Sequence, residues 1–180
     1  MKINRVILIF GLLVLTIISC KTTQSSMIIG DNYDKKQDKT TLILLPYGNI
    51  VFPNKWNKAS YNNVSKQHFF TNGDSTTITV AKNPREKYPF YKSSQTDKEF
   101  VSEFVKWDAE YWKNQGITVK TINDKSDNGY IVWQATDNKI VNTIFIFGSK
   151  NNFAYNFSGT SQKWTDNIIQ EFLIKLYTDN

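Results

Sequence analysis

Residue types that carry acid–base or covalent chemistry are scarce in this chain. His68 is the only histidine and Cys20 the only cysteine among the 180 residues. A catalytic triad or a histidine general base would have to use His68, and a zinc site needs several such ligands together. Because His68 lies in a strand-like run, Lys66-Gln67-His68-Phe69-Phe70, we expect an edge-strand histidine that is exposed or hydrogen-bonded. We predict neither a metal site nor a cofactor.

The acidic residues give weak candidates for chemistry. Asp124 and Asp127 come nearest to a calcium-binding cluster, but a solvated turn is the interpretation that we favour for them. Glu99 stands where it can cap a helix, and two later glutamates in that helix are spaced to pair with lysines. The glycine-rich phosphate-binding patterns are absent. We therefore predict that the chain is not an enzyme, and we keep a hydrolase with dispersed carboxylates as an alternative.

Cys20 has a distinctive context. Lys2 and Arg5 precede an apolar run of about 13 residues, Val6 to Ile18, which is too short for a membrane span of about 20. The run ends in Ile17-Ile18-Ser19-Cys20. This segment resembles a bacterial lipoprotein signal, whose lipobox ends in a small residue and an obligatory cysteine. The resemblance implies cleavage before Cys20 and attachment of fatty acids such as palmitate to its thiol.

This resemblance divides the chain into three parts. Residues 1–19 would be the signal peptide, 20–40 the lipidated cysteine with a flexible tether, and 41–180 one folded domain. The protein would then be anchored in the bacterial cell envelope through Cys20. Lys21 is not the aspartate that enterobacterial lipoproteins use for inner-membrane retention, so the outer membrane is favoured.

The loop between residues 82 and 95 is the candidate binding segment. It runs about 14 residues without hydrophobic periodicity, and loops of that length are often functional. Aromatic residues and arginine are enriched in interface hot spots, and the loop supplies Arg85, Tyr88, Phe90 and Tyr91. The alternative is a crossover loop whose aromatic side chains fold back over the sheet.

Local sequence patterns predict two helices, with strands before the first helix and between the two. A capping box, Thr96-Asp97-Lys98-Glu99, opens a helix that ends at Gly116. Its expected apolar stripe is Phe100, Phe104, Trp107 and Tyr111, beside Val101, Val105 and Trp112. A second helix closes the chain, with Trp164, Ile168, Phe172 and Leu176 on one stripe. Strands are expected at Thr41 to Leu45, Asn49 to Phe52, Val64 to Phe70, Ser75 to Ala81, Ile117 to Ile122, Tyr130 to Ala135, Ile140 to Phe147 and Phe153 to Ser158.

The expected fold class is α+β, an α/β/α sandwich. Two of the predicted strands, Tyr130 to Ala135 and Ile140 to Phe147, are apolar on both faces, so helices should cover both sides of the antiparallel sheet. The element order, with Asn49-Ile50-Val51-Phe52-Pro53-Asn54-Lys55-Trp56, is similar to the PsbP-like fold, which includes DcrB-type bacterial lipoproteins. The resemblance spans about residues 42 to 178. It implies binding to other proteins and carries over no catalytic residues.

Charge excludes one class of partner. Removal of Lys2 and Arg5 with the signal peptide lowers the formal charge from +6 to +4, because 20 basic residues then face 16 acidic ones. Arg85 is the only arginine left, whereas nucleic-acid contacts depend heavily on arginine. We therefore predict a membrane-anchored, non-enzymatic module that binds a protein partner. An immunity protein that neutralises a toxin in the periplasm is a further alternative.

Overall fold

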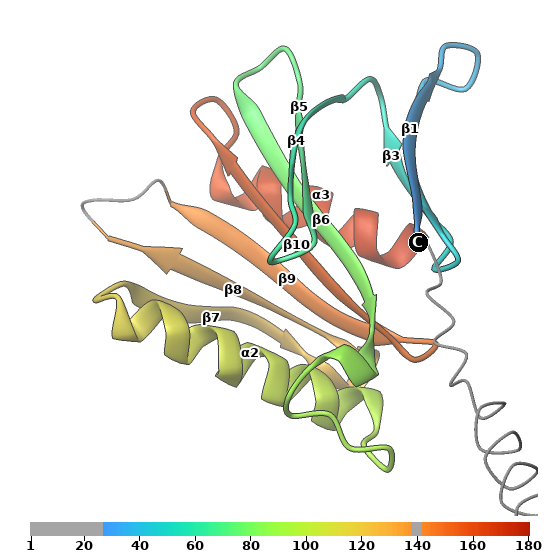
Figure 1. Cartoon of the computed structure of the whole chain (residues 1–180). Helices are drawn as coiled ribbons and strands as arrows, with labels where there is room; N and C mark the ends of the chain where they lie inside the picture. The colour runs from blue at the N-terminus through green and yellow to red at the C-terminus, as the bar shows by residue number, and fades with distance from the viewer. Residues whose placement is uncertain (1–26, 138–141) are drawn as a thin grey trace, which may run out of the picture.

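The computed structural model describes residues 27–137 and 142–180 (Figure 1). The predicted signal peptide and Cys20 lie outside this part of the chain. Within it, no helix combines the length and apolar character that crossing a membrane requires.

A seven-stranded antiparallel sheet forms the centre of the domain. Hairpin pairing between consecutive strands builds its two halves, and β6 pairs with β10 to join them. The order across the sheet is β4 (Asn57–Asn62), β5 (Gln67–Thr71), β6 (Thr76–Pro84), β10 (Phe153–Ser161), β9 (Thr143–Lys150), β8 (Tyr130–Thr136) and β7 (Thr118–Lys125).

Helix α2 (Asp97–Asn114) covers one face of this sheet over β7, β8 and β9 (Figure 1). Successive side chains of a strand point to opposite faces of the sheet, so every second residue of these strands faces the helix. Phe104 stacks on Phe147 of β9 with ring centroids 4.1 Å apart, and Trp133 of β8 stacks on Phe145 at 4.1 Å. These buried rings form the core between α2 and the sheet.

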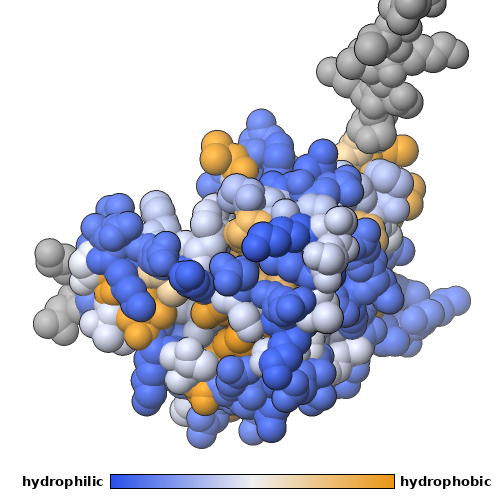
Figure 2. All heavy atoms as spheres, turned by 90° about the horizontal axis from the view of Figure 1, so that it is seen from below, coloured by the Kyte–Doolittle hydropathy of each residue, from blue (hydrophilic) through white to orange (hydrophobic). Residues whose placement is uncertain are grey.

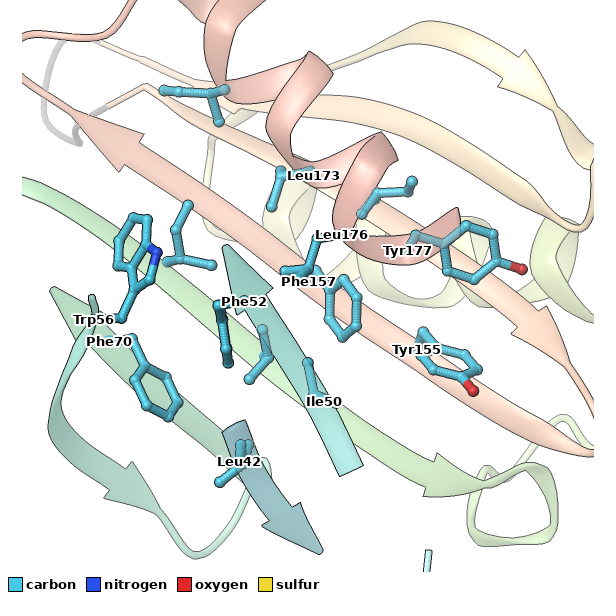
Figure 3. Packing of buried hydrophobic residues seen from close by; sticks show 14 of the residues in the cluster. Leu42, Ile50, Phe52, Trp56, Phe70, Tyr155, Phe157, Leu173, Leu176 and Tyr177 are labelled. Carbon is cyan, nitrogen blue, oxygen red and sulfur yellow. The ribbon is translucent and has the colours of Figure 1, made fainter. Parts of the chain in front are cut away.

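Helix α3 (Asp166–Asp179) and a second, three-stranded sheet share the opposite face. Figure 3 shows Phe52 of the small sheet directed towards Phe70 of β5, and their ring centroids are 4.7 Å apart. Leu173 and Leu176 of α3 are buried beside Phe157 of β10. Helices on both faces of an antiparallel sheet confirm the predicted α+β class.

The three-stranded sheet corrects the predicted domain boundary. It consists of β1 (Ile28–Asp34), β2 (Lys39–Leu45) and β3 (Asn49–Pro53), all antiparallel. The tether predicted over residues 20–40 is therefore wrong from Ile28 onward. Its polar residues gave no strand pattern because β1 is an edge strand, stabilised mainly by its backbone pairing with β2.

The ends of α2 agree with the sequence prediction. Thr96 is the N-cap of α2 and shares a capping box with Glu99, whereas Thr165 caps α3. Gly116 follows α2 with φ of 79°, the left-handed conformation that glycine adopts at no steric cost. The predicted apolar stripes are less accurate, because Trp107 and Tyr111 of α2 and Ile168 of α3 are exposed.

Candidate functional site

The loop between β6 and α2 is anchored by a buried arginine. Arg85 opens the short 3₁₀ helix η1 (Arg85–Lys87), and its side chain is only 7% exposed. Its guanidinium donates to the carbonyls of Gln95 at 2.7 Å and Thr96 at 3.4 Å, and to Asp97 Oδ1 at 3.3 Å. The same group lies 4.5 Å from the centroid of the Phe100 ring. Arg85 thus ties both ends of the loop to the start of α2.

The loop aromatics fold back on the helix. Tyr88 lies 4.6 Å from Phe104, and Phe90 lies 5.2 Å from Phe100, measured between ring centroids. Burial raises the pKa of Tyr88 to about 12, although a hydrogen bond with the Asn83 side chain acts in the opposite direction. Tyr88, Phe90 and Tyr91 are all half-buried against the core beneath α2.

These contacts change how the predicted binding residues are interpreted. Arg85 is wrong as a surface contact, because its fork-shaped head group satisfies backbone carbonyls inside the loop. Tyr88, Phe90 and Tyr91 keep part of their surface, but they also belong to the packing of α2. The alternative, an inward-folding loop, describes this segment better, with the aromatics lying over α2.

Two aromatic side chains of α2 remain at the surface, and one of them, Trp107, lies beside this loop. Trp107 is 46% exposed and Tyr111 61%. Trp107 lies 5.8 Å from Phe90 and 6.2 Å from Tyr88, between ring centroids. We call Trp107, Tyr111 and the exposed parts of Tyr88 and Phe90 the aromatic surface. Both α2 residues belong to the apolar stripe that the sequence predicts for this helix, and that stripe is wider than one helix face can bury.

Asp108 lies on the inner side of α2. Its carboxylate accepts a hydrogen bond from Trp112 Nε1 at 3.1 Å. Burial raises the pKa of Asp108 from 3.8 to about 6, and the bond from Trp112 acts in the opposite direction. The pKa values of Glu99 and Asp124 are instead lowered, mainly by their own hydrogen bonds.

His68 is buried rather than exposed. It lies on β5, which pairs with β4 on one side and with β6 on the other, so the prediction of an edge strand was wrong. The residue is 2% exposed, stacks on Tyr61 at 4.5 Å between ring centroids, and has no hydrogen-bond partner at Nδ1 within the described residues. Burial lowers its pKa to about 4, with Lys58 lowering it further and Asp31 opposing.

An open depression of about 550 Å³ lies where the start of α2 meets the end of α3. Two of its charged groups bond to each other, since Lys98 Nζ lies 2.8 Å from Asp127 Oδ1. In the adjoining turn, Asp124 accepts a hydrogen bond from Ser126 N at 2.9 Å. Asp124 and Asp127 therefore support a turn. Over residues 27–137 and 142–180, no three histidine, cysteine, aspartate or glutamate side chains are grouped to hold a metal ion.

The fold and its surface define an α+β sandwich domain with an aromatic surface on one helix. No family model and no curated protein matches the sequence. Among solved structures, the chain is similar to the solution structure of cyanobacterial PsbP (CyanoP) from Synechocystis sp. PCC 6803, with 11% identity and a TM-score of 0.44. The likeness covers 91% of this chain and 96% of that one.

Proposed function

We propose that this protein is a lipid-anchored lipoprotein of the bacterial cell envelope whose domain binds another protein and catalyses no reaction. The observation that carries the binding role is the exposure of Trp107 and Tyr111 on one side of α2. Tryptophan and tyrosine dominate interface hot spots, and their rings become favourable contacts once a partner removes water from them.

The packing around the aromatic surface supports a preformed contact area. Phe90 and Tyr88 contact Trp107 from below the helix surface, and Arg85 fixes the loop that carries them. Rigid aromatic groups lose little conformational freedom on binding. The anchor is supported by the order of charged residues, apolar run and Cys20 in the sequence.

A photo-crosslinking amino acid at position 111 of the full chain tests the binding role in intact cells. We expect one discrete protein adduct at this position. The matched control is position 168, because Ile168 is a surface residue on α3, exposed to 47% where Tyr111 is exposed to 61%. Equal labelling at both positions, without a discrete adduct, would overturn the binding role. A crosslinked toxin would identify the immunity form of this function.

The anchor is tested separately through the thiol. The full chain should incorporate a fatty-acid probe in its native host, and Cys20→Ala should lose the label and accumulate as a precursor. Cys20→Ser is the conservative control, since it keeps a nucleophilic atom but not the thiol that acylation requires. Fatty-acid label that persists in both variants would refute lipidation at Cys20.

A further inference from the structure

Two exposed apolar side chains mark the end of the domain from which the N-terminal segment leaves. Ile28 begins β1 and pairs in register with Leu45, the last residue of β2. They are 61% and 46% exposed. In Figure 2, orange hydrophobic spheres gather where the described part of the chain begins, next to the grey spheres. Water-exposed aliphatic side chains at one place favour contact with an apolar phase.

Aromatic rings and a lysine continue this surface beyond Leu45. Tyr47, in the turn after β2, lies 5.8 Å from Phe153 at the start of β10, between ring centroids. Lys82 Nζ lies 5.1 Å from the centroid of Phe153. The space next to Gly48 is filled by the same ammonium, which would lie 3.3 Å from a Cβ added there. Tyrosine and lysine beside aliphatic residues are typical of a membrane–water interface.

A second lysine adds positive charge at this end. Lys82 Nζ and Lys150 Nζ each lie 5.4 Å from the ring centroid of Tyr155. Within the described residues, 27–137 and 142–180, neither the Lys82 nor the Lys150 ammonium forms an ion pair with a carboxylate. Lys150 donates to the Tyr177 carbonyl at 2.7 Å, and nearby Asp179 is held by Lys175. Two like charges around one ring fit the phosphate of an anionic lipid.

The position of the proposed lipid anchor indicates that this end of the domain contacts the membrane. Cys20 precedes Ile28 by eight positions, and eight residues span at most about 28 Å when fully extended. The bilayer that holds the acyl chains therefore lies within reach of this end of the domain. A segment that long also allows this end to contact the lipid surface directly, without stretching the connection.

We infer that this end of the domain rests on the phospholipid surface, with Ile28 and Leu45 entering the interface and Lys82 and Lys150 contacting lipid phosphates. The inference depends on the proposed lipidation of Cys20 and adds an orientation to it. The domain then has a fixed side towards the membrane instead of floating at the end of its linker.

A fluorescent probe on the full, lipidated chain tests this orientation. Because acylation consumes the Cys20 thiol, an introduced cysteine is the only one free to react. The probe is placed at Leu45→Cys, and the control is Lys36→Cys, in the β1–β2 turn at the other end of the same strands, roughly 20 Å away at about 3.4 Å per residue. Vesicles contain phosphatidylethanolamine and phosphatidylglycerol, with a lipid-borne quencher.

We expect several-fold stronger quenching and a blue-shifted emission at position 45 relative to position 36. Equal, weak quenching at both positions, with the fatty acid still on Cys20, would overturn the orientation but leave the anchor intact. Loss of the fatty acid itself would overturn both. A blue shift that rises with protein density and shows no lipid quenching would mean that a second copy covers this surface, which also contradicts the inference.

The charge contribution has its own variant. Lys82→Gln should lower the quenching at position 45 on these anionic vesicles, and added salt should do the same, because exposed charge interactions are screened. Lys36→Gln, at the other end of the hairpin, should leave the quenching unchanged. Unchanged quenching in Lys82→Gln would show that Lys82 does not take part in the proposed contact.

Discussion

The ring of Tyr177 at the end of α3 fills the space where Gly148 of β9 would carry a side chain. A Cβ added to Gly148 would lie 2.6 Å from Tyr177 Cζ. The Tyr177 hydroxyl donates to the carbonyls of Gly129 at 3.0 Å and Ser149 at 3.2 Å. The last turn of α3 is therefore fixed to the sheet by a ring that needs a glycine beneath it.

Gly148→Ala should lower the free energy of unfolding by about 2–3 kcal/mol, because the tightly packed ring must move away from its two hydrogen bonds. Gly73→Ala is the matched control, since a Cβ at Gly73 meets nothing within 4 Å. Urea unfolding of both variants measures the difference. Equal stability of the two variants would mean that α3 tolerates a displaced Tyr177.

How accurately the sequence predicts a region depends on the kind of signal that the region carries. The capping box of Thr96 and Glu99 and the glycine after α2 are local chemistry, and the structure confirms both. The edge strand β1 depends on pairing with β2, so its polar sequence predicted a tether instead. Gly148 gave no signal, because its role is defined by a ring 29 positions later in the chain.

The candidate site shows the same division. The 82–95 loop was recognised from its aromatic residues and length, but Arg85 turned inward because backbone carbonyls of Gln95 and Thr96 lie there to accept from it. Helical periodicity grouped Trp107 with Phe104, yet only Phe104 meets the sheet. Which side of a wide apolar stripe stays exposed is decided by the position of the sheet, which the sequence pattern does not define.

Arg85→Lys should destabilise the domain even though it keeps the charge. A lysine cannot donate in a planar fork to two carbonyls and a carboxylate, so we expect a loss of about 1–3 kcal/mol in the free energy of unfolding. Lys87→Arg, in the same 3₁₀ helix but exposed, is the control. Thermal melts at neutral pH make the comparison, and an unchanged melting temperature in Arg85→Lys would contradict the anchoring role.

Asp108→Asn should stabilise the protein at neutral pH. The pKa of Asp108 is about 6 in the folded state and 3.8 as the ordinary value, so the native state loses stability as pH rises between these values. Removing the charge recovers about 1–3 kcal/mol at pH 7, whereas the gain should vanish near pH 4. Denaturant melts across this range measure it; a gain that is the same at every pH would point to packing instead.

His68→Phe should reduce the sensitivity of the fold to acid. The pKa of His68 falls from 6.5 to about 4 on folding, so wild-type stability is lost as pH drops through this window, opposite to the effect of Asp108. In His68→Phe the Asp108 slope dominates above the range in which Glu99 and Asp124 titrate, and stability should then fall as pH rises from about 5 to about 6. The double variant with Asp108→Asn should be flat over that same range. If His68→Phe still loses stability as the pH drops from about 6.5 to about 5, another group causes that loss.

Substitutions on either side of the aromatic surface should separate packing from binding. Tyr88→Ala removes a ring that contacts Phe100, Phe104 and Trp107, so stability should fall by about 3 kcal/mol or more. Tyr111→Ala removes a ring that is 61% exposed, so the melting temperature should barely change. Partner capture by Tyr111→Ala should nevertheless weaken by about 1–3 kcal/mol if Tyr111 is an interface anchor.

The two measurements must be made on the same variants to be decisive. Ile168→Ala serves as the surface control because its side chain is similarly exposed on the other helix, and it should affect neither quantity. Melting temperature and the amount of partner that co-purifies with the protein are then compared in Tyr88→Ala, Tyr111→Ala and Ile168→Ala. If capture falls only where stability falls, the aromatic surface belongs to the fold alone. Loss of capture in stable Tyr111→Ala would place the contact on α2.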